Sequence, residues 1–218
     1  METRAAPSTP ANLVACAAHL AAGRLAILPT DTVYGIVADA SDERAVRAIY
    51  DAKGKGSEAP LQLLFGPSRH QLDRYAALTP VAEALVEALG PGGWTIIVPA
   101  RTGWSSAALA GGTTVGFRIP GAPVVHRVVE LLGGPLAASS ANRHGGPSPT
   151  TCEEAIGQVG EHCACAIDAG PTREGLDSTV IDCAGDEPRV LREGAIDRLT
   201  VARILGLETI TVLRSVRP

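Results

Sequence analysis

Aromatic residues are scarce in this chain of 218 residues, because Phe, Trp and Tyr together make up only 3% of it. Many RNA-binding modules stack bases on such side chains, so their scarcity argues against a base-stacking module. An excess of positive charge is also missing: 19 Lys and Arg stand against 23 Asp and Glu, which gives a net charge of −4. This balance disfavours the basic surface typical of sequence-independent nucleic-acid binding, although a local basic cleft stays open.

Long apolar runs are absent as well. The most apolar stretch near the N-terminus, residues 11–28, is interrupted by His19, Gly23 and Arg24. Neither a membrane-spanning run nor a signal-peptide pattern is present. We therefore expect a soluble cytoplasmic protein with no membrane contact.

Paired cysteine motifs are missing too, because none of the five cysteines forms a Cys-x-x-Cys pair. Cys163 and Cys165 flank one residue in a strand-like segment, so we expect their side chains to point to the same side. A zinc site would need two more ligands, and only His162 is near. The sequence therefore predicts buried free thiols in a reducing compartment and no protein-bound metal.

The chain does contain enough apolar material for a core, since 45% of its residues are hydrophobic. With 24 Gly and 16 Pro it also contains many turns, which are the usual place for functional residues. We find no repeat and no low-complexity linker. We expect one domain over 1–218, with the first eight and the last four residues frayed.

Strand and helix patterns alternate along the chain without a strict repeat. Thr-Pro pairs at 9–10 and 79–80 are typical helix starts. The predicted helices are 10–22, 43–52, 80–89, 123–132, 151–159 (capped by Thr150) and 200–205. The predicted strands are 25–28, 61–65, 94–98, 114–119, 136–139, 164–168, 178–182 and 189–192. Because several strands follow one another with only loops between, we expect an α/β fold with a twisted mixed sheet.

Three polar segments are candidates for chemistry. Residues 29–35 (Pro-Thr-Asp-Thr-Val-Tyr-Gly) place hydroxyls at a strand end, where they could bind a small ligand or only satisfy a turn. Lys53 and Lys55 alternate with glycine after a helix, so they could approach phosphate or only complement the helix C-terminus. Ser140 and Asn142 follow an apolar strand and would share one side of extended backbone, or form a simple turn. The P-loop and Gly-x-Ser-x-Gly patterns are both absent.

Charged residues at strand ends complete the candidates. Arg118 and Arg192 each end an apolar strand, where a guanidinium could hold phosphate or carboxylate, or could simply face solvent. Asp31 and Asp177 could contribute to magnesium binding, but no spacing marks a dedicated cage.

Taken in order, these segments resemble the YrdC-domain family, the L-threonylcarbamoyladenylate synthases, over about residues 10–200. The collinear series is Pro-Thr-Asp-Thr-Val-Tyr-Gly (29–35), Lys-Gly-Lys (53–55), Pro-Gly-Gly-Trp-Thr (91–95), Val-Gly-Phe-Arg-Ile-Pro (115–120), Ser-Ala-Asn (140–142), Gly-Pro-Ser-Pro-Thr (146–150), Asp-Ser-Thr-Val (177–180) and Leu-Arg-Glu-Gly-Ala-Ile (191–196).

The resemblance implies a single α/β domain around a large basic cavity. It also implies that L-threonine, bicarbonate or CO₂ and ATP are condensed to threonylcarbamoyl-AMP and pyrophosphate. Partner proteins would then transfer the threonylcarbamoyl group to tRNA, next to the anticodon. Mg²⁺ is expected with ATP, a tightly bound organic cofactor is not, and a weak contact of the enzyme with tRNA is allowed.

The resemblance also assigns roles to residues of this sequence. The catalytic set is Lys53, Lys55, Ser140 and Asn142, and the ATP-binding set adds Arg192. The threonine-binding set is Thr30, Thr32, Thr114, Arg118 and Ser178.

The sequence departs from the family pattern at three places. Lys55 replaces the arginine of Lys-x-Arg, which keeps the charge but loses the bidentate fork. A histidine of some members is replaced near Leu64, and His144 stands where serine is common.

Two other interpretations stay open at this stage. One is a tRNA or double-stranded RNA binding module, which the charge and the few aromatics disfavour. The other is a paralogue acting on another carbamoyl adenylate, a domain that normally lies within a much longer chain.

Overall fold

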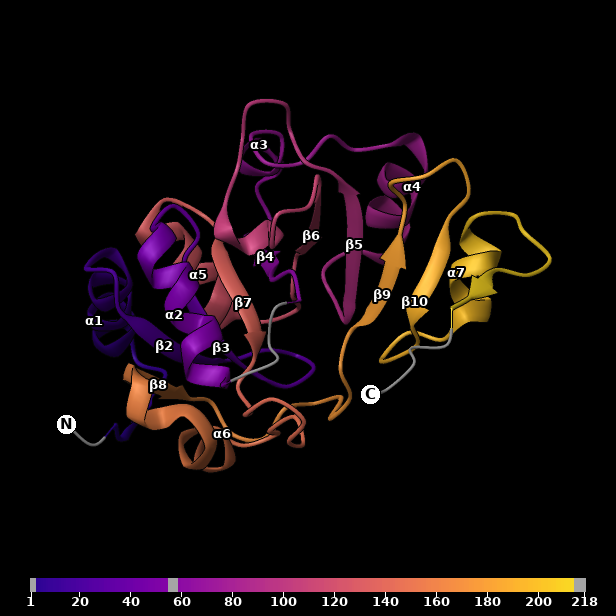
Figure 1. Ribbon diagram of the computed structural model, residues 1–218. Helices are drawn as coiled ribbons and strands as arrows, with labels where there is room; N and C mark the ends of the chain where they lie inside the picture. The colour runs from indigo at the N-terminus through magenta and orange to yellow at the C-terminus, as the bar shows by residue number, and fades with distance from the viewer. Residues whose placement is uncertain (1–2, 55–58, 214–218) are drawn as a thin grey trace.

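The computed structural model describes residues 3–54 and 59–213, whose strands all join one mixed sheet (Figure 1). The strand order is β1-β8-β2-β3-β7-β4-β6-β5-β9-β10-β11. The sheet contains both parallel neighbours, such as β4 and β6, and antiparallel neighbours, such as β5 and β6. The predicted α/β class with a mixed sheet and flanking helices is therefore confirmed.

The bounds of the elements agree with most of the predicted ranges. The strands are β1 (Ala5–Pro7), β2 (Leu25–Pro29), β3 (Tyr34–Asp39), β4 (Gln62–Leu64), β5 (Trp94–Pro99), β6 (Thr114–Arg118), β7 (Leu136–Ser140), β8 (Cys163–Asp168), β9 (Thr179–Asp182), β10 (Arg189–Arg192) and β11 (Thr211–Val212). The α-helices are α1 (Pro10–Ala21), α2 (Glu43–Lys53), α3 (Arg69–Leu72), α4 (Pro80–Leu89), α5 (Pro123–Leu132), α6 (Cys152–Val159) and α7 (Arg198–Ile204). Two 3₁₀ turns, η1 (Ala107–Leu109) and η2 (Gly160–His162), complete them.

Local signals explain where the helices begin. The Thr9 and Thr79 side chains cap α1 and α4, as predicted, and Pro follows each cap. At α6 the predicted cap Thr150 is wrong by one residue. Thr151 is the N-cap, because its side chain and that of Glu154 form a reciprocal capping box.

Two other predictions about the chain are corrected. Residues 5–7, expected to be frayed, form β1, because they pair in parallel with residues 166–168 of β8. Strand β3 was not predicted. It is buried on both faces except at its last residue, so its sequence lacks the alternation that marks a half-exposed strand.

The prediction that Cys163 and Cys165 point to the same side is wrong, because β8 contains a bulge. Cys163 pairs with Leu25 and Cys165 with the next residue, Ala26, so the intervening residue is extra on the β8 side. Cys163 consequently joins the core on one face of the sheet, while Cys165 packs against the core on the other.

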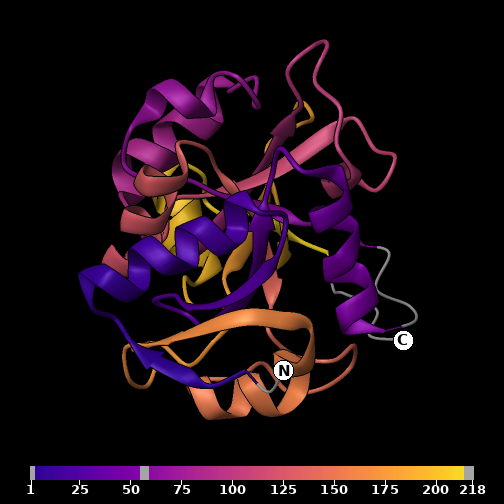
Figure 2. The ribbon, with the colours of Figure 1, turned by 90° about the vertical axis from the view of Figure 1, so that its left-hand side faces the viewer.

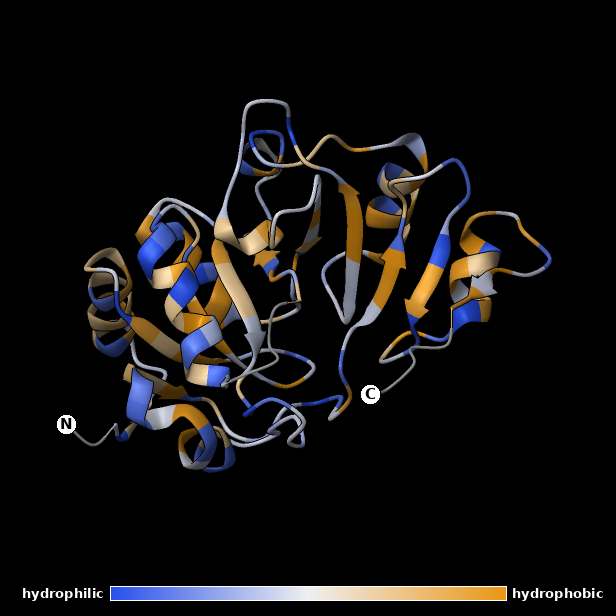
Figure 3. Ribbon diagram, viewed as in Figure 1, coloured by the Kyte–Doolittle hydropathy of each residue, from blue (hydrophilic) through white to orange (hydrophobic). Residues whose placement is uncertain are grey.

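Helices cover the two faces of the sheet unequally. The larger core cluster includes residues of α2, α4, α6 and α7 on one face. On the opposite face only α1 and α5 contribute helical residues to the second cluster, where they pack on residues of β2, β3, β4, β7 and β8. Figures 1 and 2 show α1 and α5 side by side at one end of the molecule, and Figure 3 shows hydrophilic residues on the outer sides of the helices.

Within residues 3–54 and 59–213, the second core cluster contains no residue of β6, β5 or β9, so its helices leave these strands uncovered on this face. This uncovered part of the sheet is where the polar residues of the strand ends meet. Among the described residues, none of the helices combines the length and apolarity needed to cross a membrane.

Candidate functional site

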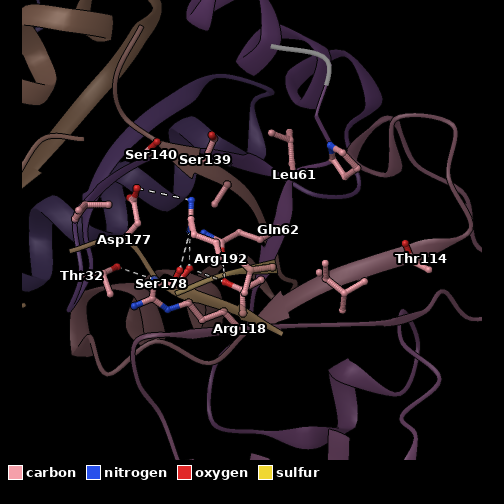
Figure 4. A pocket seen from close by; sticks show the side chains of 17 residues that line it. Thr32, Leu61, Gln62, Thr114, Arg118, Ser139, Ser140, Asp177, Ser178 and Arg192 are labelled. Carbon is pink, nitrogen blue, oxygen red and sulfur yellow. Dashed lines mark hydrogen bonds and ion pairs between the residues drawn. The ribbon is translucent and has the colours of Figure 1, made fainter. Parts of the chain in front are cut away.

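A pocket of about 230 Å³ lies on the uncovered part of the sheet, and we call it the main pocket (Figure 4). Its floor consists of lateral neighbours on adjacent strands: Ala138 of β7 pairs with Gln62 of β4, which pairs with Gly116 of β6. Ile97 of β5 pairs with Gly116 in turn. Two of these four floor residues, Ala138 and Gly116, carry almost no side chain, so the sheet itself is accessible to a ligand.

The main pocket brings together six of the predicted site residues from distant parts of the sequence. They are Thr32, Thr114, Arg118, Ser140, Ser178 and Arg192. Their convergence on one face follows from the strand order, in which β7, β4, β6, β5 and β9 are consecutive neighbours.

Lys53 and Asn142 line an adjoining cavity of about 220 Å³, which we call the side pocket. The two pockets share Ser140 and part of the chain around Leu61, so they form one continuous depression. His144 lies at the exposed edge of the side pocket, and its backbone N–H donates to the Lys53 carbonyl at 2.9 Å. The other replaced position, Leu64, is buried in the second core cluster.

The Lys53 ammonium organises the turn after β7. Its Nζ donates to the Ser140 carbonyl at 2.7 Å, to the Asn142 carbonyl at 2.7 Å and to Asn142 Oδ1 at 3.3 Å. Burial lowers the pKa of Lys53 from 10.5 to about 8, because the charged form loses solvation, while the carboxylate of Asp177 opposes the shift. In this arrangement Lys53 fixes two backbone carbonyls and one amide of the predicted nucleotide contact.

The side chains of Ser140 and Asn142 contact each other where β7 ends and the chain turns, so the backbone is not extended through both residues as one interpretation of the sequence expected. The Ser140 hydroxyl donates to Asn142 Oδ1 at 2.5 Å. The Asn142 amide donates in turn to the carbonyls of Arg143 and Gly146 at 2.9 and 2.8 Å. The turn is therefore rigid and holds both side chains at the junction of the two pockets.

Arg118 is almost fully buried at the end of β6, and its guanidinium is occupied within the protein. It forms an ion pair with Asp31, donates from Nη1 to Thr32 Oγ1 at 2.7 Å and from Nε to the Gly92 carbonyl at 2.9 Å. Burial lowers the pKa of Arg118, and the Asp31 carboxylate counteracts that effect. Arg118 thus orients the Thr32 hydroxyl and stabilises the turn that carries it.

Thr30 lies outside the main pocket. Its hydroxyl donates to the Val33 carbonyl at 2.6 Å and lies 2.9 Å from the Thr32 hydroxyl. It borders a different cavity beside Gly121 and Arg173. The structure therefore places Thr30 in the turn that supports Thr32. Lys55, predicted in the catalytic and ATP-binding sets, lies outside the described residues.

Ser178 and Arg192 form the other wall of the main pocket. Arg192 donates from Nη2 to the Ser178 carbonyl at 2.9 Å and to the Ser178 hydroxyl at 3.2 Å. Its Nη1 lies 3.7 Å from Asp177 Oδ2, and the other carboxylate oxygen, Oδ1, accepts from the Ser148 hydroxyl at 2.9 Å. Figure 4 shows the side chains of Asp177, Ser178 and Arg192 pointing into the same space as that of Thr32.

Three polar residues of the main pocket were not singled out from the sequence as site residues: Gln62, Thr95 and Ser139. Thr95 bonds to Gln62 Oε1 at 2.7 Å and lies 2.8 Å from the Ser178 hydroxyl. A signal existed at Gln62, because it is the only polar residue within the apolar segment 61–65.

Two glycines allow the site segments to approach one another closely. A Cβ on Gly194 would lie 2.1 Å from the Asp177 carbonyl oxygen and 2.8 Å from that of Ser178. A Cβ on Gly93 would lie 2.6 Å from the Cβ of Ala195 and 3.2 Å from the Thr32 side chain. Both glycines are thus required by proximity, whatever their backbone angles.

The described part of the chain does not contain a metal site made of protein ligands. It holds no cluster of three or more His, Cys, Asp or Glu side chains that could bind an ion. Asp31 is engaged by Arg118 and by the Gly121 N–H at 3.1 Å. Charged side chains of the two pockets are mainly basic, with Lys53, Arg118 and Arg192 against Asp177. The arrangement suits an anionic ligand that brings its own cation.

Comparisons with known proteins show which proteins this chain is similar to. The family model Sua5_yciO_yrdC, described as telomere recombination, matches residues 18–194. A Mycobacterium tuberculosis protein, named provisionally as a threonylcarbamoyl-AMP synthase, is 39% identical over 201 residues and 90% of each chain is covered. The Bacillus subtilis threonylcarbamoyl-AMP synthase is 36% identical over 191 residues, which are 87% of this chain and 55% of that protein.

A solved structure is similar over nearly the whole chain. It is Pyrococcus abyssi Sua5 complexed with L-threonine, which superposes with a TM-score of 0.87 at 34% identity. The match covers 92% of this chain and 58% of the Pyrococcus chain, so this chain spans a little over half of that relative. Escherichia coli YciO has the same fold at a TM-score of 0.78, with 24% identity and coverage of 87% and 92%.

Proposed function

Because the chain belongs to the Sua5/YciO/YrdC family, we propose that it is a threonylcarbamoyl-AMP synthase. The observation that carries the proposal is the continuous depression formed by the main and side pockets. It joins the hydroxyls of Thr32 and Ser178 to the turn fixed by Lys53, and one relative with this fold was solved with L-threonine. The family membership supports the reaction, and the depression supports the location that we propose for it on this chain.

The reaction condenses L-threonine, bicarbonate or CO₂ and ATP. The amine of threonine and CO₂ give an unstable N-carboxy compound, whose carboxylate oxygen attacks the α-phosphorus of ATP. A new O–P bond forms, the bond from the α-phosphorus to the bridging oxygen breaks, and pyrophosphate leaves. The protein must hold two reactants close together and exclude water until the attack occurs.

The two pockets divide this task. We assign the nucleotide to Lys53, Ser140 and Asn142 around the side pocket, with Arg192 reaching it from the wall of the main pocket, because cations and amide groups favour the charge of a triphosphate. We assign threonine to the side with Thr32 and Ser178. Arg118 acts there by orienting Thr32, and Thr30 by supporting it.

The remaining assignments follow from the resemblance. Thr114 lines the main pocket at its edge, and Lys55 keeps its predicted phosphate role. ATP enters as its Mg²⁺ complex, since its phosphates coordinate the ion themselves. The enzyme acts in the cytoplasm, where partner proteins transfer the threonylcarbamoyl group to tRNA. The names of the relatives favour this function over an RNA-binding module.

The decisive measurement is pyrophosphate release from ATP and bicarbonate with and without L-threonine, with L-serine as a decoy. We expect release to depend on threonine. Release that does not respond to threonine would refute the proposed function.

Two variants test whether Lys53 and Asn142 belong to the nucleotide site. Lys53→Ala and Asn142→Ala should each lower threonine-dependent release at least about 100-fold while circular dichroism shows an intact fold. Glu130→Ala, on the exposed face of α5, is the matched control and should behave as wild type. Normal activity of both pocket variants would refute the assignment of the side pocket to the nucleotide.

A further inference from the structure

Four side chains from four separate segments form a line of hydrogen bonds in the main pocket. The Thr95 hydroxyl donates to Gln62 Oε1 at 2.7 Å and lies 2.8 Å from the Ser178 hydroxyl. Arg192 Nη2 donates to that same Ser178 hydroxyl at 3.2 Å. Thr95 and Ser178 are almost fully buried, with exposed fractions of 5% and 4%, so their hydroxyls are not free to turn towards bulk water.

The direction of every bond in this line is determined at its two ends. A hydroxyl has one proton to donate, and an amide oxygen can only accept. Thr95 gives its proton to Gln62 and must therefore accept from Ser178. Ser178 gives its proton to Thr95, and its oxygen accepts from the Arg192 cation, which can only donate.

This direction decides what Ser178 offers to a ligand. Its proton is donated to Thr95 and one lone pair accepts from Arg192, so one lone pair of the Ser178 oxygen remains for a ligand. A ligand group that meets Ser178 must therefore be an N–H or an O–H, and a carboxylate or phosphate oxygen at the same place would face another acceptor.

We infer that Gln62 is a positioning residue that orients the Thr95 and Ser178 hydroxyls, so that Ser178 accepts a hydrogen bond from the amino-acid substrate. The inference rests on the proposed function for the identity of that substrate. L-threonine has such donors in its amine and its side-chain hydroxyl, and its N-carboxy form keeps an N–H. Gln62 thus acts on the substrate through two other residues.

Loss of the Gln62 oxygen should reverse the line. In a Gln62→Leu variant the buried Thr95 proton has lost its acceptor, and the Ser178 oxygen is the nearest one. Ser178 would then point its own proton at the substrate donor. We expect the KM for L-threonine to rise roughly 3- to 10-fold, the effect of one hydrogen bond, while the KM for ATP stays unchanged.

A double-mutant cycle with Thr95 separates positioning from direct contact. Thr95→Val removes the link, so Gln62→Leu should change the KM for threonine little in that background. Thr95→Ser keeps the hydroxyl and should resemble wild type. Gln71→Leu replaces a partly buried glutamine of α3, away from both pockets, and serves as the control.

The outcomes are distinguishable from those of the proposed function. Three results together support the inference. Pyrophosphate release depends on threonine, Gln62→Leu raises the KM for threonine but not that for ATP, and the rise is absent in the Thr95→Val background. Active enzyme with an unchanged KM for threonine in Gln62→Leu, or with additive effects of Gln62→Leu and Thr95→Val, overturns it and leaves the synthase assignment standing. Wild-type enzyme that neither uses nor binds L-threonine, measured by calorimetry, refutes both.

Discussion

At the scale of single residues, burial determines what the charged side chains of the site can do. Lys53 is 8% exposed, and all three of its hydrogen bonds go to the turn after β7. Its lowered pKa means that the charged form, which this turn and a triphosphate both need, is lost at moderately alkaline pH.

The pH dependence of activity follows from this shift. With a pKa of about 8 instead of 10.5, Lys53 becomes neutral as pH rises through 8, so pyrophosphate release should decline there. A Lys53→Arg variant stays charged in this range, because guanidinium pKa values exceed 12, and its residual activity should lack that decline. An identical alkaline limb in both proteins would show that another group causes it.

The free energy of unfolding should also depend on the protonation of Lys53, but it should rise with pH where the activity falls. The folded pKa of Lys53 lies below the unfolded one, so burial of the charge lowers stability at pH values under 8. Between pH 8 and 10.5 the folded protein loses this proton first, and the contribution of Lys53 to stability rises with pH. Urea unfolding of wild type and Lys53→Met across this window would measure the difference.

The Asp31–Arg118 ion pair shows a second consequence of burial. Asp31 and Arg118 are at most 3% exposed, so removal of one partner leaves an uncompensated buried charge. Asp31→Ala should lower the free energy of unfolding by about 3–5 kcal/mol. The exposed Arg127–Glu130 pair on α5 is the matched comparison, and Glu130→Ala should cost less than about 1 kcal/mol. Equal effects of the two variants in denaturant unfolding would contradict this account.

At the scale of elements, the site depends on how closely the ends of strands approach one another. The segment after β10 contacts the chain before β9 with no space for a side chain at Gly194. The Ala195 N–H donates to the Asp177 carbonyl at 2.9 Å, and the Gly194 N–H donates to the Thr179 hydroxyl at 2.9 Å. Ser178, which lies between, is therefore positioned by two flanking backbone contacts.

A methyl group at this junction should displace the Ser178 segment. We expect Gly194→Ala to cost about 1–3 kcal/mol of stability and to lower threonine-dependent activity more than about tenfold. Gly134→Ala is the control, because its added Cβ would meet no heavy atom within 4 Å. Thermal unfolding and pyrophosphate release would be measured for both, and unchanged activity in Gly194→Ala would show that the close contact is dispensable.

At the scale of the whole molecule, the uneven distribution of helices creates the site. Helices α1 and α5 cover one end of the second face, and the rest of that face contributes the floor of the main pocket. The floor spans β7, β4, β6 and β5 in the middle of the sheet, and strands on both sides continue from it. A ligand bound there contacts elements whose pairing holds the entire sheet together.

Ligand binding should consequently raise the stability of the global fold. At 100 times the dissociation constant a ligand adds about 2.7 kcal/mol, which corresponds to several degrees in the unfolding midpoint for a chain of this size. L-threonine with a non-hydrolysable ATP analogue should raise the midpoint, whereas L-leucine with the same analogue should add nothing beyond the analogue alone. Equal shifts with both amino acids would contradict a pocket built for a hydroxy amino acid.

Local signals in the amino-acid sequence suffice for the helix starts, for several strand ends and for the order of the motifs. Thr-Pro pairs at 9–10 and 79–80 mark helix starts because a hydroxyl cap and a fixed proline φ act within one turn. Arg118 and Arg192 stand at strand ends, as their position after apolar runs predicts. Strand β3 and the bulge in β8 could not be predicted, because two-sided burial removes the alternation and the extra residue exists only relative to a paired strand.

Which polar groups meet depends on how distant segments pack in the folded chain. Gln62 and Thr95 are 33 residues apart, and Thr95 and Ser178 are 83 residues apart. Their contact depends on the order β4-β6-β5-β9, with crossovers that no local propensity encodes. For the same reason the sequence could name Arg118 as a site residue but could not show that Asp31, 87 residues away, already occupies its guanidinium.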